Sequence, residues 1–110
     1  MQIQLNPLTT ERLTQSLAGK PGQFKMFYDT EDCGCNGVLV IRIVNAPSPT
    51  DIVFQTEPFT FLCDRQQESL FDEIMRLEAE VGYPSYKLTS DSTLFGSNIR
   101  VQDSREQASR

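Results

Sequence analysis

The sequence predicts a mainly β domain, a compact sandwich or barrel-like fold with one helix near its amino terminus. Two observations indicate this class. Short apolar segments alternate with polar residues or run through β-branched ones, separated by Gly, Pro and Asn. Helical spacing is clear only near the amino terminus. The 110 residues suffice for one domain with its own core, and we expect this domain to cover residues 1–103, followed by a polar, mobile tail at residues 104–110.

The helix is predicted to begin at Asn6 and Pro7. Asn is a preferred capping residue, and Pro is well tolerated at the first helical position because the amide there has no partner within the helix. An apolar stripe then leads to Gly19 through Leu8, Leu13 and Leu17.

Alternating or continuous apolar residues predict strands at residues 24–28, 38–44, 51–55 and 59–63, with shorter candidates at residues 86–89 and 99–102. The β-branched segment 38–44 is expected to be covered on both faces. Residues 70–81 fit both helical spacing and alternation, and we favour a short helix or turn followed by a strand from about Met75.

Two further groups of residues are assigned from their polarity and spacing, one to the surface and one to the core. Asp64, Arg65 and residues 66–68 are interpreted as a solvated turn. Seven aromatic residues at strand spacing are assigned to the core, namely Phe24, Phe27, Tyr28, Phe54, Phe59, Phe61 and Phe71.

Composition excludes several classes of partner. The net charge is -5 with no run of Lys or Arg, so we expect no nucleic acid and no anionic membrane as a partner. The amino terminus has no signal-peptide pattern, and the longest apolar run, residues 38–41, ends at Arg42. Three cysteines without a secretion signal indicate reduced thiols and a cytoplasmic location.

Reactive chemistry is concentrated in Cys33-Gly34-Cys35, just before the most apolar run. The chain has no histidine, so a metal site here requires thiolates, carboxylates, water or ligands from a second chain. We therefore predict Cys33 and Cys35 as metal ligands and as exposed, reactive thiols. The alternative is that one or both are small buried residues that pack a turn.

Nearby carboxylates bear on this site in two ways. Asp29, Glu31 and Asp32 could complete an iron site, but their charge also raises the pKa of a neighbouring thiol. Deprotonation assisted by a metal is therefore favoured over nucleophilic reactivity without one. Without histidine no Cys-His or Ser-His-Asp arrangement can form, so we do not expect an enzyme.

Cys63 is a candidate third ligand, but the pattern favours the core. It shares a predicted strand face with Phe59 and Phe61, which is typical of a small buried residue. We predict that Cys63 is buried.

The order of these parts resembles the HesB/IscA-like iron–sulfur cluster biosynthesis domain over roughly residues 2–103. The resemblance rests on an opening strand and helix, the element Gly34-Cys35-Asn36-Gly37, a strand ending in Cys63-Asp64, and a late Tyr-Lys-Leu-Thr-Ser stretch. It implies a compact β-rich fold, a cytosolic protein that forms dimers or tetramers, and binding of iron or an iron–sulfur cluster in assembly and delivery. Cys35 is the position that matches the family's first cysteine.

The sequence also departs from that family. The assembly members carry a carboxy-terminal Cys-Gly-Cys, where this chain reads Ser-Thr-Leu-Phe-Gly-Ser-Asn-Ile at residues 92–99. Cys33 is an additional thiol, as in the YqkB-like branch. One chain is thus short of four ligands, whereas a homodimer that brings two Cys-Gly-Cys segments together would supply them.

Three functions follow from this comparison. The first is a protein that binds iron or a cluster and meets assembly or client proteins. The alternative is a degenerate family member that acts as a non-metal interaction module. A thiol redox pair formed by Cys33 and Cys35 is third.

Overall fold

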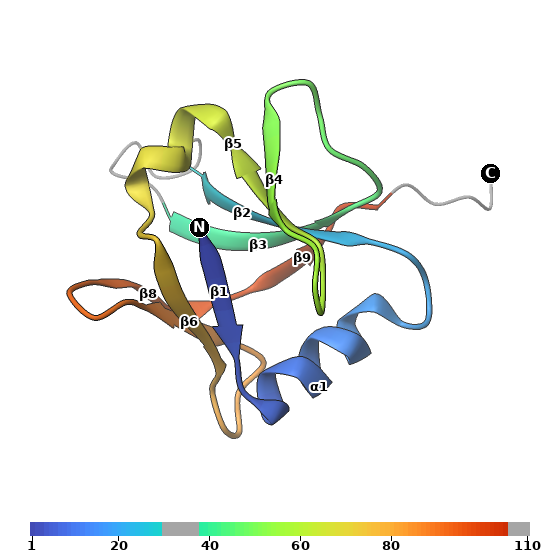
Figure 1. Ribbon diagram of the computed structural model, residues 1–110. Coiled ribbons are helices and arrows are strands. Elements are labelled where there is room, and N and C mark those ends of the chain that lie inside the picture. The colour runs from blue at the N-terminus through green and yellow to red at the C-terminus, as the bar shows by residue number, and fades with distance from the viewer. Residues whose placement is uncertain (30–37, 106–110) are drawn as a thin grey trace.

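The computed structural model describes residues 1–29 and 38–105, which form two β-sheets packed face to face (Figure 1). The first sheet has the strand order β1 (Gln2–Leu5), β6 (Ile74–Ala79), β7 (Tyr86–Thr89), β8 (Leu94–Ile99). The second has the order β4 (Asp51–Gln55), β5 (Phe61–Asp64), β2 (Gln23–Asp29), β3 (Val38–Val44), β9 (Val101–Asp103). An α-helix, α1 (Pro7–Leu17), and a 3-10 helix, η1 (Arg65–Leu70), accompany them. The predicted mainly β class with an amino-terminal helix is confirmed.

Strand β2 lies in the middle of its sheet. It pairs antiparallel with β3 from Gln23↔Val44 to Asp29↔Val38 and parallel with β5 from Phe24↔Phe61 to Met26↔Cys63. The β2–β3 hairpin is therefore held by neighbours on both sides, β5 beyond β2 and β9 beyond β3.

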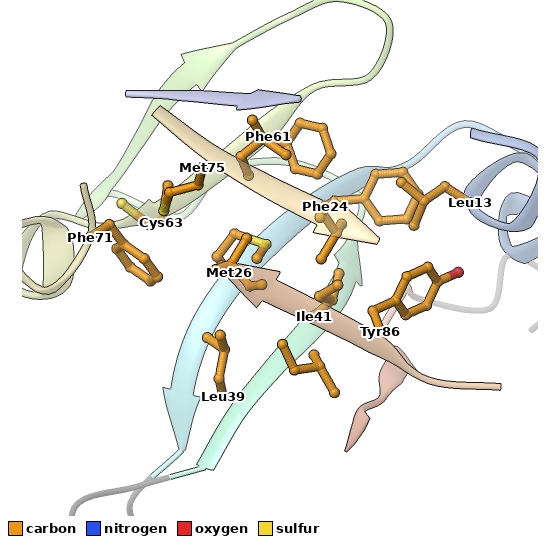
Figure 2. Packing of buried hydrophobic residues seen from close by; sticks show 14 of the residues in the cluster. Leu13, Phe24, Met26, Leu39, Ile41, Phe61, Cys63, Phe71, Met75 and Tyr86 are labelled. Carbon is orange, nitrogen blue, oxygen red and sulfur yellow. The ribbon is translucent and has the colours of Figure 1, made fainter. Parts of the chain in front are cut away.

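The inner faces of both sheets share one hydrophobic core (Figure 2). Phe24 and Phe61 are its largest fully buried side chains, with ring centroids 5.8 Å apart. Leu13 of α1 and Met75 of β6 are fully buried in the same cluster. Hydrophobic burial thus ties the helix and both sheets into one packed unit.

Helix α1 begins as predicted. The Asn6 side chain caps it by accepting from the Thr9 amide at 2.8 Å and from the Thr9 hydroxyl at 2.7 Å. The buried Thr9 hydroxyl in turn accepts from the amide of Ala79 at 2.8 Å, which joins the first turn of α1 to the end of β6. The helix ends at Ala18, whose φ of 54° lies in the left-handed region.

Two strands were not predicted from the residue pattern. Strand β1 entered only through the family resemblance, and β8 was not predicted at all. Residues 99–102, predicted as one strand, instead divide between β8 and β9, which belong to opposite sheets. Asn98, within β8, has a φ of 56° where the β7–β8 register shifts, and its amide donates to Glu80 Oε1 at 3.2 Å.

The assignment of Phe27 to the core is wrong. Successive residues of a strand point to opposite faces, and Phe24 and Met26 occupy the inner face, so Phe27 lies on the outer face of β2. Residues 38–44 were predicted to be covered on both faces of the sheet. On the outer face this is true of Val40, which is buried, but Val38 is 57% exposed.

The end of the described chain is attached to α1. The Arg105 guanidinium donates to the carbonyl of Leu17 at 2.9 Å and to Asp103 at 2.7 and 2.9 Å. The hydrogen bonds from Arg105 to the Asp103 carboxylate lower the pKa of Asp103 to about 2. Residues 106–110 lie outside the described part, so the mobility of the tail stays a prediction. No helix in residues 1–29 or 38–105 is long and apolar enough to cross a bilayer.

Candidate functional site

The predicted thiol site is attached to the end of the β2–β3 hairpin. Cys33 and Cys35, together with Glu31 and Asp32, belong to residues 30–37, outside the described residues. The segment joins Asp29 to Val38, and these two residues form the last pair of the β2–β3 ladder. The described part of the site is therefore this end of the hairpin and the residues that contact it.

On the β5 side, a glutamine side chain takes over where strand pairing stops. Strand β5 pairs with β2 only as far as Cys63, and Asp64 then caps η1 by accepting from the Gln66 amide at 2.8 Å. From η1, the Gln67 side chain donates to the carbonyl of Tyr28 at 3.0 Å and accepts from the Tyr28 amide at 2.9 Å. The side-chain amide of Gln67 thus takes the place of a β5 residue beside Tyr28, one residue before β2 ends at Asp29.

The sequence had placed this residue in a solvated turn. Gln67 is instead half-buried, while its neighbour Gln66 is exposed. The two glutamines are indistinguishable in sequence because the Gln67 contact spans 39 residues. The capping residue Asp64 before a short helix was the only local signal available.

We expect Gln67→Glu to lower the free energy of unfolding by about 1–3 kcal/mol, because a carboxylate cannot donate to the Tyr28 carbonyl and leaves it unpaired. Gln66→Glu adds the same charge one residue away and should change the free energy of unfolding by less than about 0.5 kcal/mol. Urea unfolding of both variants measures the difference. Hydrogen exchange at the Tyr28 amide should also speed up in Gln67→Glu alone. Equal destabilisation by the two substitutions would contradict the role of Gln67.

The outer face of the hairpin carries two cations around one aromatic ring. The Arg42 guanidinium lies 4.3 Å and the Lys25 ammonium 5.3 Å from the centroid of Phe27. Arg42 also pairs with Asp29 at 3.3 Å, and Lys25 pairs with Asp51 at 2.9 Å. Arg42 therefore offsets the charge of Asp29, the carboxylate that directly precedes residues 30–37 in the chain.

Cys63 is fully buried, as predicted, in the core between the sheets (Figure 2). Burial, together with the smaller effect of the carboxylates of Glu68, Asp51 and Asp64, raises the pKa of its thiol to about 11. Because a metal ligand must be a thiolate, the raised pKa makes Cys63 a poorer ligand than a thiol with an ordinary pKa. Within residues 1–29 and 38–105, no three Cys, Asp or Glu side chains come close enough together to hold a metal ion.

Comparison with known proteins identifies the family. A family model described as iron-sulphur cluster biosynthesis matches residues 1–103. The chain belongs to this iron–sulphur cluster biosynthesis family. A search of curated proteins found no significant match.

Solved structures of Fe-S biosynthesis proteins share the fold. A candidate Fe-S biosynthesis protein from Lactobacillus salivarius has a TM-score of 0.79 at 17% identity, covering 96% of this chain and 100% of its own. One from Lactobacillus acidophilus has a TM-score of 0.73 at 14% identity, covering 94% and 90%. SufA from Escherichia coli, which is involved in biosynthesis of iron-sulfur clusters, has a TM-score of 0.61 at 14% identity, covering 83% and 82%.

In this iron–sulphur cluster biosynthesis family member, aromatic side chains also pack against the inner face of the hairpin end. Tyr28 packs on Phe71 with ring centroids 5.6 Å apart, and Phe71 packs on Phe95 of β8 with ring centroids 6.1 Å apart. Strands β2 and β8 and the end of η1 therefore meet beneath the point where residues 30–37 begin.

Proposed function

We propose that this protein binds iron or an iron–sulfur cluster through Cys35 and Cys33 and acts in the assembly or delivery of clusters. The observation that carries the proposal is the family match over residues 1–103, since it includes the segment in which both thiols occur. The proposed role is one of binding and transfer in the cytoplasm, without catalysis of its own.

The placement of the family's second cysteine element supports this assignment. In this chain the corresponding residues, 92–99, contribute strand β8, whose Gly96 packs on β3: a Cβ at Gly96 would lie 3.8 Å from the Cβ of Leu39. Leu39 follows Val38, and Cys35 is three residues before Val38, which limits their Cα separation to about 11 Å. If residues 92–99 correspond to the family's second cysteine element, as the sequence resemblance implies, that element runs beside β3, the strand that follows Cys35 in the chain.

The number of ligands points to two chains. Cys63 is left out of the proposed ligand set because its side chain is fully buried in the apolar core, where deprotonation is unfavourable. Asp29 is engaged with Arg42, so using it as a ligand would cost that ion pair. Two chains related by a two-fold axis would supply four thiolates, two from Cys33 and two from Cys35, which is the number that a two-iron cluster requires. The cluster is then cargo held between two hairpin ends.

Anaerobic reconstitution of the full chain with ferrous iron and sulfide tests the proposal. We expect visible absorption, iron and sulfide in equal amounts, and a native mass of two chains when the cargo is bound. A fully loaded monomer would contradict the two-chain arrangement. A wild-type protein that stays colourless and free of iron would reject metal binding and favour the non-metal interaction module.

A further inference from the structure

A second surface of the molecule, distant in sequence from the thiols, has the properties of a peptide-binding groove. A hollow of about 700 Å³ lies between α1, the turn that joins β6 to β7, and β9. Ile43 and Tyr86 in its lining are buried, while Gln15, Tyr83 and Arg100 are exposed. A small molecule in so open a hollow would keep much of its surface in water, whereas an extended segment could run along it.

One wall of the groove is the unpaired edge of a sheet. Strand β9 is the last strand of its sheet and pairs only with β3 among the described strands. The carbonyl of Arg100 accepts from Ile41, and the amide of Ser104 donates to Ile43. Because alternate residues of a strand direct their backbone groups to opposite sides, Val101 and Asp103 present theirs away from β3. These are the β9 residues that line the groove.

Two arginines without a carboxylate partner among the described residues line the same groove. Arg12 Nη1 donates to the carbonyl of Tyr83 at 2.6 Å, and Arg100 Nε donates to Asn98 at 3.3 Å, which leaves further N–H groups of each guanidinium available. The carboxylate in the lining, Asp103, is already bound by Arg105. The groove is therefore locally basic in a chain of net charge -5. At physiological salt this net charge is screened beyond about 8 Å, so local contacts decide what binds.

We propose that this groove binds an extended acidic segment of a partner protein, which pairs with the free edge of β9 and places carboxylates against Arg12 and Arg100. Backbone pairing supplies affinity, and the two guanidinium groups select for Asp or Glu. The exposed ring of Tyr83 offers an apolar contact at one end. The inference goes beyond cluster binding, because none of its residues is a thiol ligand.

The experiment uses fluorescence anisotropy with a labelled peptide of about eight alternating valine and glutamate residues, a length that spans β9 with two or three residues to spare at each end. Arg12→Gln combined with Arg100→Gln should weaken binding at least about tenfold. Arg65→Gln combined with Arg76→Gln makes the same change in net charge outside the groove and should leave the affinity within about twofold. Arg100→Gln alone, at an exposed position, should weaken binding at least about threefold and does not depend on the Arg12–Tyr83 contact.

Two control peptides separate charge from strand pairing. A peptide with lysine in place of glutamate should bind at least about tenfold more weakly, as should the acidic peptide with alternate backbone amides methylated. Cys35→Ser should bind the peptide as the wild type does, which distinguishes this inference from the proposed function. Equal binding of the acidic and lysine peptides, or of the methylated one, would overturn the proposal. The proposal would also be overturned if the protein failed to bind the acidic peptide but bound citrate, and if Arg12→Gln combined with Arg100→Gln weakened the binding of citrate. The groove would then be a site for small carboxylates.

Discussion

Replacing Cys35 with serine should abolish retention of iron and sulfide after anaerobic reconstitution. A hydroxyl is a hard, weakly acidic donor, whereas clusters select thiolates, and in a two-chain site the substitution removes two of four ligands at once. Cys33→Ser should have a similar effect for the same reason. Iron and sulfide analysis, visible absorption and native mass measure the outcome.

Two substitutions serve as controls for this result. Cys63→Ala should retain the cargo and lower the free energy of unfolding by about 1 kcal/mol, because it removes a buried core atom and no ligand. Asp32→Asn should retain most of the cargo, since a carboxylate contributes less than sulfur to cluster selection. A cluster that survives in Cys35→Ser, or one that is lost in Cys63→Ala, would show that the ligand set is wrong.

Phe24→Ala should lower the free energy of unfolding by about 3–5 kcal/mol, the largest effect that we expect from a single core substitution. The ring is fully buried and packs edge-on against Phe59 at 5.4 Å and beside Phe61 at 5.8 Å. Its removal would leave a cavity where both sheets meet. Such a loss is a large part of the stability of an ordinary domain, about 5–15 kcal/mol.

Phe27→Ala is the matched control, three residues along the same strand. Its ring lies on the outer face, where it contacts Arg42 and Lys25, so truncation should cost about 1 kcal/mol. Urea unfolding of both variants, together with Phe24→Leu in case Phe24→Ala fails to fold, checks the prediction. A cost for Phe27→Ala as large as that for Phe24→Ala would contradict the assignment of the two faces.

Some of the structural features behind these predictions could be predicted from the sequence, and others could not. The start of α1 is a local matter, because Asn6 caps amides within its own turn, and it was predicted correctly. Strands β3 and β4 were also predicted with their observed bounds, since period and β-branching act within a few residues. Burial of Cys63 followed from the same alternation with Phe61.

Strand β8 shows where local pattern fails. Its residues include Gly96, Ser97 and Asn98, which are poor strand formers. Gly96 pairs with Leu88 of β7 and lies against Leu39 of β3, whereas Asn98 has a φ of 56° where the β7–β8 register shifts. Residues 99–102 divide between two sheets because their strand partners differ: Ile99 pairs with Tyr86 of β7, whereas Val101 pairs with Ile41 of β3. Neither partner can be identified from the segment itself.

By itself the sequence determined the β class, the helix start, the buried cysteine and the candidate thiol pair, because each depends on residue chemistry or short-range periodicity. Only the tertiary structure distinguished Gln67 from Gln66 at the base of the thiol segment and placed Phe27 on the outer face beside Arg42. It alone brought Arg12 and Arg100, 88 residues apart, to the free edge of β9. These features depend on contacts between residues far apart in the chain, and such contacts leave no periodic trace in sequence.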